Sequence, residues 1–178
     1  YKKILVDETF INIDRRGKYL IFETDYYYLV AHLRMEGKYF LMHDEALSKH
    51  DHIVYNFYDE SNLRYNDVRK FGVIYLFNKN EFKDIEALEE VYPLNTLGYE
   101  PFDKRMTVEY LSDKFKKSSL PIKSALLDQS IISGLGNIYA DEVCFLAKLH
   151  PLILAKDLSE KDLENIISAS IKVLNKAI

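Results

Sequence analysis

The 178-residue sequence has one cysteine, four prolines and no tryptophan, and it lacks any long uninterrupted apolar run. The single Cys144 excludes an internal disulfide and a cysteine-rich zinc site, and its apolar neighbours predict a buried, inert thiol. No stretch approaches the ~20 apolar residues of a membrane helix, so we expect no membrane partner. Such sparse use of cysteine favours a reducing, intracellular setting.

Basic residues are fewer than acidic ones, 24 Lys and Arg against 28 Asp and Glu, so the formal net charge is −4. This balance argues weakly against a nucleic-acid partner, but a local basic stripe can bind phosphates inside an acidic chain. Hydrophobic residues make up 48% of the sequence, which supports a substantial core and argues against disorder.

Short segments rich in Tyr, Phe, Ile and Val, separated by turn residues, predict strands in the first part of the chain. They cover residues 9–13, 19–24, 27–33, 39–42, 52–58, 63–66 and 72–77. Short strands with frequent turns favour an antiparallel sandwich or barrel. Residues 80–92 fit a surface helix, and residues 93–106, with Pro93, Gly98 and Pro101, read as a linker.

From Thr107 onward the apolar spacing is helical, which makes the fold class α+β: an antiparallel β-sandwich over residues 1–92, followed by a helical domain over residues 107–178. Residues 121–128 predict one short helix. A second helix follows, whose apolar face we expect to hold Tyr139, Val143, Leu146 and Ala147. Ser159 with Asp162 predicts a capping box before a final helix. Its apolar stripe would be Leu163, Ile167, Ser170 or Ile171, Leu174 and Ile178.

Gly134 and Gly136 lie between the first two of these helices, where they permit a tight turn and leave backbone N–H groups open. Asn137 is then expected at the helix N-cap, beside the positive end of the helix dipole, which suits a phosphate. A plain glycine turn joining two packed helices explains the same residues. A dinucleotide fingerprint does not, because the third glycine and the preceding apolar strand are missing.

Three other segments admit both a structural and a functional interpretation. Arg15-Arg16-Gly17-Lys18 at a strand start is either a solvated cluster or a phosphate contact. Lys49-His50-Asp51-His52 places two histidines on one strand face, but a third metal ligand is not evident, so we predict no metal site. Asp67–Gly72 is by itself a turn with a salt bridge. In the helical part, Lys114, Lys116, Lys117 and Lys123 form a basic edge.

Asp128-Gln129, the stretch Gly134–Glu142 and His150-Pro151 together resemble the helix–two-turn–helix signature of the formamidopyrimidine-DNA glycosylase family. Four further motifs match the family in the same order: Arg15–Leu20, His32–Gly37, Lys49–His52 and Asp67–Gly72. The similarity runs from about Asn12 to the end. The combination of the last three motifs resembles the branch of the family that removes oxidised purines.

This resemblance implies a base-excision repair enzyme that removes 8-oxoguanine and formamidopyrimidines and then cuts the abasic strand by β,δ-elimination. It implies damaged double-stranded DNA as the partner, a monomer, and a bacterial cytoplasmic protein associated with the nucleoid through DNA. A second hypothesis is a non-catalytic DNA-binding protein that keeps the fold.

The resemblance also implies roles for individual residues. Lys18 would contact the backbone at the lesion and assist elimination. Met35 would fill the space left by the extruded base. Arg69 would read the orphaned cytosine, and Phe71 would wedge beside that cytosine, so all three are void-filling or intercalating residues. The remaining DNA contacts would be His32, His50, Lys117, Lys123 and Asn137. With an ordinary imidazole pKa, the His32 contact would weaken above pH ~7.

The sequence departs from the family in three places. Val68 replaces the usual proline and Lys70 a common second arginine, which bears on the rigidity of that loop. The N-terminal proline nucleophile and its neighbouring glutamate are missing. The C-terminal zinc finger is missing too, so we expect no cofactor in this chain. Because the sequence opens at Tyr1 and closes at Ile178 inside an apparent helix, we expect a fragment that is catalytically inactive as given.

Overall fold

The computed structural model describes residues 3–177 and divides the chain into two compact units that meet between Lys83 and Asp84. The first unit contains the strands and the second the longer helices, as the α+β prediction requires. Leu88 and Leu94 are buried in the structure, and both belong to the second unit. The sequence-based boundary lay later, at residue 92. Within the described residues, no helix is both long and apolar enough to cross a membrane.

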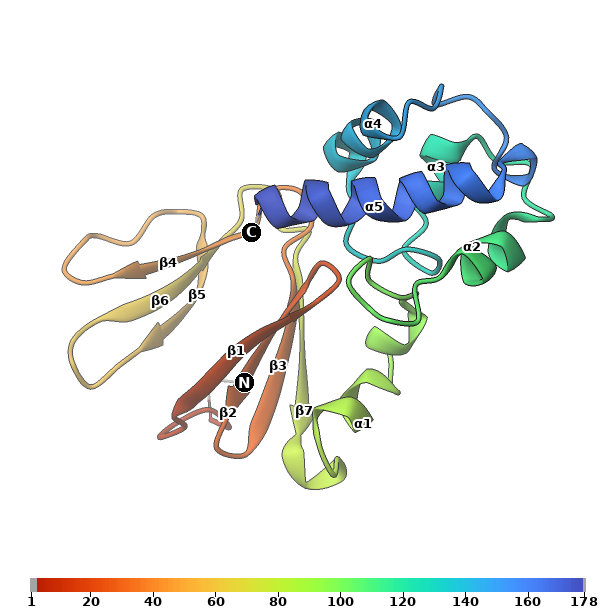
Figure 1. The fold of residues 1–178 in the computed structure, drawn as a ribbon. Coiled ribbons are helices and arrows are strands. Elements are labelled where there is room, and N and C mark those ends of the chain that lie inside the picture. Colours follow the sequence, from red (N-terminus) through yellow and green to blue (C-terminus); the bar gives the residue numbers. More distant parts are fainter. Residues whose placement is uncertain (1–2, 178) are drawn as a thin grey trace. The chain divides into compact units, whose positions relative to one another are not determined.

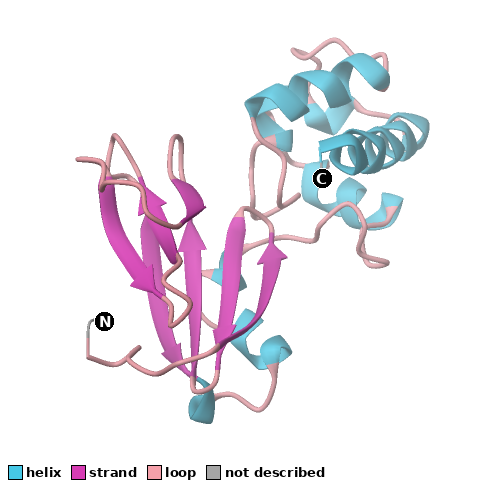
Figure 2. Ribbon diagram, turned by 90° about the vertical axis from the view of Figure 1, so that its left-hand side faces the viewer, coloured by secondary structure: helices cyan, strands magenta, loops and turns pink. Residues whose placement is uncertain are grey.

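The first unit is an antiparallel β-sandwich, which confirms the predicted architecture (Figures 1 and 2). One sheet has four strands in the order β1-β2-β3-β7, and the other has three in the order β4-β6-β5. The bounds are β1 (Phe10–Arg16), β2 (Tyr19–Thr24), β3 (Tyr27–His32), β4 (Lys38–Met42), β5 (Asp51–Asn56), β6 (Asn62–Asn66) and β7 (Val73–Asn78). Each predicted strand is present, with ends that shift by up to a few residues.

Side chains from both sheets meet in the core of the sandwich. Phe22, Leu29 and Ala31 of the four-stranded sheet are buried there. Residues of the other sheet, including Tyr39, Tyr55 and Leu63, pack against them. Phe10 on the edge strand β1 adds edge-to-face contacts with the rings of Phe22, Tyr55 and Phe57. Such contacts add to the stabilisation from burial itself, and they join the two sheets.

The second unit is built around a single helical core. Its helices are α1 (Ile85–Glu89), α2 (Val108–Phe115), α3 (Ile122–Leu126), α4 (Asn137–Leu146) and α5 (Glu160–Ala177). Short 3₁₀ turns lie at Lys79–Glu81 in the first unit and at Leu94–Thr96 and Ala155–Asp157 in the second. The predicted capping box is present at the start of α5, where the Ser159 and Asp162 side chains each accept the other residue's backbone N–H.

Two predicted helix faces were right in part, and the observed buried faces are rotated slightly from them. On α4 the buried residues are Ala140, Val143 and Cys144, followed by Ala147 at its C-cap, whereas Leu146 is 36% exposed. The prediction followed the largest apolar side chains, but small residues fill the buried face of α4, and α4 packs against α5. On α5 the buried stripe is Leu163, Ile166, Ala169, Ser170, Val173 and Leu174. The predicted Ile167 and Ile171 are half-buried, and Ile178 lies outside the described residues. The predicted burial of Cys144 is confirmed, and burial raises the pKa of its thiol.

Candidate nucleic-acid interface

Lys18 lies in the two-residue turn that joins β1 to β2, directly before β2 begins at Tyr19 as predicted, whereas Arg15 and Arg16 end β1. Arg16 pairs with Tyr19 across this hairpin, and Gly17 takes a left-handed φ of 58°. Glycine in the first central position suits the tight turns that match strand twist. Arg15 fixes the turn further by donating from Nη1 to the Gly17 carbonyl at 2.9 Å. Partial burial lowers the pKa of Lys18, which favours a more nucleophilic amine than an ordinary lysine.

His32 lies at the end of β3, opposite Tyr19 of β2 in the sheet register. Burial, followed by the positive charges of Arg34 and Lys18, lowers its pKa to about 4. The imidazole of the free protein is therefore neutral at pH 7, which favours a DNA contact that does not weaken above that pH. Its Nδ1 accepts the backbone N–H of Arg34 at 3.0 Å, which leaves the proton on Nε2. His32 can thus donate one hydrogen bond to an anion without carrying charge.

Met35, Arg69 and Phe71 come together from two loops that are distant in sequence. Arg69 Nη1 lies 3.1 Å from Met35 Sδ, and its guanidinium carbon lies 4.6 Å from the centre of the Phe71 ring. Met35 is 70% exposed and Phe71 is 51% exposed, although both are apolar. These three residues, here named the wedge cluster, form an exposed group of two apolar side chains around one cation.

Asp67 organises the loop that carries Arg69 and Phe71, and it does so by hydrogen bonds, not by the expected salt bridge. Its carboxylate accepts the backbone N–H of Arg69 at 3.0 Å and of Gly72 at 2.9 Å. It also accepts the hydroxyl of Tyr65 at 2.8 Å. The Gly72 N–H contributes most to lowering the pKa of Asp67 to about 2, so the carboxylate stays charged in neutral solution.

Tyr65 touches both loops of the wedge cluster. A Cβ on Gly72 would lie 1.7 Å from the Tyr65 hydroxyl, and a Cβ on Gly37 would lie 2.9 Å from it. Both positions therefore require glycine next to this buried ring. Burial, followed by the Asp67 carboxylate, raises the pKa of Tyr65 to about 12. The family has proline where this chain has Val68. The rigidity of the loop does not depend on that position alone, because Tyr65 and Asp67 also hold the loop in place.

His50 and His52 do not share a strand face as predicted. His50 precedes β5, and the register of β5 against β6 shifts between Asp51 and Ile53, so the alternation is broken there. His52 instead donates from Nε2 to the Asp67 carbonyl at 2.7 Å. Across residues 3–177, no group of three His, Cys, Asp or Glu side chains is arranged to hold a metal ion. His50 and the exposed Lys49 remain candidates for contact with an anion.

In the helical unit, Gln129 shapes the glycine turn before α4. Its amide donates to the carbonyls of Leu127 and Leu135, and its oxygen accepts the Gly134 N–H at 3.0 Å. Gly134 has a φ of 100°, a conformation that favours glycine. The N-cap of α4 is Gly136, not Asn137 as predicted, because Asn137 already belongs to the first helical turn. Its exposed side chain therefore lies at the positive end of the helix without capping it.

The predicted basic edge of the helical unit is partly neutralised. Lys123 Nζ lies 2.7 Å from a carboxylate oxygen of Asp141 on α4, and Lys116 pairs with Asp113 at 2.6 Å. The Lys114 ammonium lies 5.5 Å from the centre of the Tyr110 ring. Lys117 is exposed. An anion that reaches Lys123 would compete with an exposed ion pair, which is a weak competitor.

The structure thus groups Met35, Arg69 and Phe71, and it places Lys18 near enough to His32 to affect its pKa. Sequence reasoning gave no role to Asp67 or Tyr65 as supports for the wedge cluster. A local signal for Asp67 does exist, since an aspartate two residues before a loop arginine often accepts that residue's N–H in an Asx turn. For Tyr65 there is no such signal, because its contacts with Gly37 and Gly72 are tertiary.

Comparison with known families and proteins gives a consistent result. Residues 1–74 match the family model described as the formamidopyrimidine-DNA glycosylase N-terminal domain. Residues 97–178 match the formamidopyrimidine-DNA glycosylase H2TH domain. Among curated relatives, formamidopyrimidine-DNA glycosylase from Bacillus cereus is 44% identical over 180 residues, and the same-named protein from Bacillus licheniformis is 45% identical over 179. Both alignments cover the whole chain but only 63% of the relative's length.

Solved structures of similar proteins contain DNA. Lactococcus lactis Fpg bound to DNA with an abasic site is 40% identical, with a TM-score of 0.89, over 99% of this chain and 64% of that one. The complex of the same bacterial protein with DNA containing Fapy-dG gives the same identity and TM-score, over 65% of its chain.

Proposed function

Because this chain belongs to the formamidopyrimidine-DNA glycosylase family, we propose that it binds damaged double-stranded DNA in base-excision repair, at a nucleotide turned out of the helix. Enzymes that act on a base must extrude it, since its glycosidic bond is out of reach inside the stack. The observation that carries the proposal is the wedge cluster, an exposed group that has both apolar surface and a guanidinium able to donate hydrogen bonds.

In this proposal each member of the wedge cluster has a separate task. Met35 and Phe71 enter the vacated space, because apolar side chains replace lost stacking without requiring hydrogen bonds there. Arg69 donates to the base left without a partner, and cytosine offers acceptors to a guanidinium. The contact between Arg69 and the Phe71 ring supports this role, since it holds the guanidinium beside the ring before DNA arrives.

The phosphate contacts are proposed to come from both units. Lys18, His32 and His50 serve in the β-sandwich, and Lys117, Lys123 and Asn137 in the helical unit. His32 contributes a neutral Nε2–H donor. Lys18 contributes positive charge, and each neutralised phosphate releases counterions from the DNA.

A measurement of salt dependence tests the Lys18 contact. Lys18→Met should lower the slope of log affinity against log salt by about one unit, because one phosphate contact is lost. Lys83→Met, a change at an exposed lysine outside the proposed interface, is the matched control and should leave the slope unchanged. An unchanged slope for Lys18→Met would remove Lys18 from the interface.

The resemblance to bifunctional glycosylase/lyases supports base removal and strand cleavage as the activity of the whole protein. These 178 residues contain no proline followed by glutamate, so we propose that this polypeptide by itself binds lesions without excising them. The amine of Lys18, with its lowered pKa, is the candidate for slow elimination at a pre-formed abasic site. A structural zinc does not fit the described residues, since Cys144 is buried and no cluster of ligands is present there.

The decisive experiment compares binding to two duplexes that differ only in a stable abasic analogue opposite cytosine. We expect preference for the abasic duplex, and loss of that preference in Phe71→Ala without weaker binding to the intact duplex. Equal affinity for the two duplexes in the unmodified chain would reject the proposal.

Gel cleavage of an 8-oxoguanine duplex, with borohydride present and absent, tests the proposal that this polypeptide does not excise the lesion. Covalent trapping on that duplex would contradict it.

A further inference from the structure

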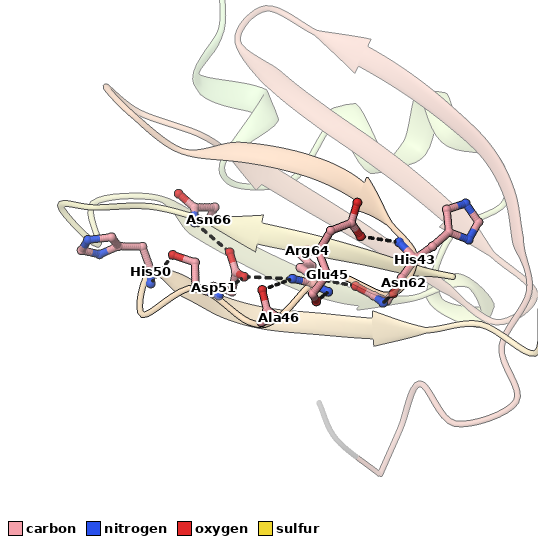
Figure 3. A network of polar contacts seen from close by, with 9 residues as sticks. His43, Glu45, Ala46, His50, Asp51, Asn62, Arg64 and Asn66 are labelled. Carbon is pink, nitrogen blue, oxygen red and sulfur yellow. Dashed lines mark hydrogen bonds and ion pairs between the residues drawn. The ribbon is translucent and has the colours of Figure 1, made fainter. Parts of the chain in front are cut away.

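Arg64 of β6 is the most deeply buried cation in the part of the chain that the structure describes, with 3% of the residue exposed. It lies on the same face of β6 as Asn62 and Asn66, because alternate residues of a strand share a face. Figure 3 shows these residues around Asp51 and around the turn that precedes β5. The guanidinium Nε donates to the Asn62 side-chain oxygen.

Arg64 joins the sheet to the turn that precedes β5, with two partners in strands and two backbone carbonyls in the turn. Nη2 donates to the Glu45 carbonyl at 2.6 Å, and Nη1 donates to the Ala46 carbonyl at 3.1 Å. Nη1 also lies 3.5 Å from Asp51 Oδ2 in an ion pair whose side chains are 4% and 5% exposed. Only a guanidinium has donors spread widely enough to reach two carbonyls and a carboxylate together.

Asp51 extends this network toward His50. Its Oδ1 accepts the Asn66 amide at 2.7 Å, and its Oδ2 accepts the Ser48 backbone N–H at 2.8 Å. The Ser48 hydroxyl oxygen in turn accepts the His50 N–H at 3.2 Å. The backbone on both sides of Lys49 is therefore tied, through Asp51, to Arg64. In Figure 3 the His50 ring points away from the network, so these contacts fix the turn and leave the ring available.

We propose that Arg64 is a positioning residue for DNA binding, which holds residues 45–51 so that Lys49 and His50 meet a DNA phosphate. This inference rests on the proposed function, and it adds a residue that does not itself reach DNA. The buried network explains why an arginine occupies a strand interior: every buried side-chain nitrogen and oxygen among the described residues has a hydrogen-bond partner. A rigid turn binds a phosphate more tightly than a mobile one, because less conformational entropy is lost on binding.

The test is a double-mutant cycle on affinity for the abasic duplex opposite cytosine, with Arg64→Lys, His50→Ala and both together. Lysine keeps the charge beside Asp51 but cannot donate to both carbonyls. We expect Arg64→Lys to weaken binding by a factor similar to that for His50→Ala, and to have little further effect in the His50→Ala background. It should also speed amide hydrogen exchange at Ser48 and His50. Arg105→Lys makes the same chemical change at an exposed pair with Asp103 and should change neither readout.

Three results separate the possible failures. Weaker binding by His50→Ala but not by Arg64→Lys, or full additivity of the two, overturns the positioning role alone. Failure of the unmodified chain to bind the abasic duplex overturns the proposed function. If Arg64→Lys does not fold, Asn66→Ala replaces it, since that change removes one donor to Asp51 and leaves the Arg64–Asp51 pair in place. Asn66→Ala must then show the same non-additivity with His50→Ala for the proposal to stand.

Discussion

Burial sets the ionisation of the residues nearest the proposed lesion site. The sequence alone left the ordinary imidazole pKa for His32, but the structure half-buries this ring beside Arg34 and Lys18. Both neighbours disfavour a second positive charge, and the pKa falls to about 4. In the unfolded chain the imidazole has a pKa near 6.5. Between that pH and pH 4, the imidazole therefore stays neutral in the folded state while it gains a proton in the unfolded state. Stability contributed by His32 is present above that pH and is lost as the pH falls toward 4.

The corresponding prediction concerns DNA binding. The ratio of the affinities of the unmodified chain and of His32→Ala should stay constant between pH 6 and pH 8, because His32 is neutral across that range. Fluorescence anisotropy with the abasic duplex at fixed ionic strength measures this ratio. A ratio that shrinks as the pH rises through 7 would mean that the bound imidazole is charged.

Arg69 carries the base specificity in the proposed function. Arg69→Ala should reduce preference for cytosine opposite the lesion by ~1–3 kcal/mol, the usual value of a good side-chain contact to a base, with a smaller loss of overall affinity. Binding to duplexes with each of the four opposite bases measures this preference. Lys70→Asn is the control, since it removes a charge from the same loop and asparagine tolerates the positive φ at that position. A loss equal for all four bases would reassign Arg69 to a backbone contact.

At the scale of elements, β6 supports three loops of the proposed interface from its two faces. Tyr65 and Arg64 are adjacent in sequence and so point to opposite sides of the strand. Tyr65 contacts the loops that carry Met35 and Arg69, and Arg64 holds the turn before His50. Loops are usually the most mobile parts of a fold. Here one strand of the rigid sandwich anchors all three.

A pair of glycine substitutions tests the Tyr65 anchor. Gly72→Ala should destabilise the sandwich by ~1–3 kcal/mol through overpacking against the Tyr65 hydroxyl, and Tyr65→Phe should relieve part of this cost. Gly37→Ala is the control, because its closest clash is with the Leu33 backbone oxygen, which Tyr65→Phe does not move. Urea unfolding of the single and double variants gives the coupling energies. Equal coupling for Gly37 and Gly72 would contradict the proposed contact.

At the scale of the whole molecule, each of the two units has a hydrophobic core among the described residues. One lies between the sheets around Phe22 and Leu29, and the other joins the helices around Leu111, Leu126 and Ile166. A compact unit with its own core can fold independently. We therefore predict that residues 84–178, expressed alone, give a helical circular dichroism spectrum and a cooperative thermal transition. A non-cooperative melt would show that the helical unit requires the sandwich.

The sequence by itself determined the order of strands and helices, because alternation, helical spacing and turn residues are local signals. The Ser159–Asp162 capping box and the glycine turn before α4 follow from the same kind of signal. The motifs were also sufficient to indicate the family, and two family models match the chain.

Only the tertiary structure decided how distant residues act together. Arg69 and Met35, which are in contact, lie 34 residues apart in the sequence. Tyr65 comes close to Gly37 and Gly72 only in the folded chain, so no local sequence pattern predicts this contact. The buried face of α4 was mispredicted for a related reason, since packing distance, not side-chain size, selects the residues at a helix interface. The pKa of His32 likewise depends on charges and burial that exist only once β2, β3 and their connecting turns are in place.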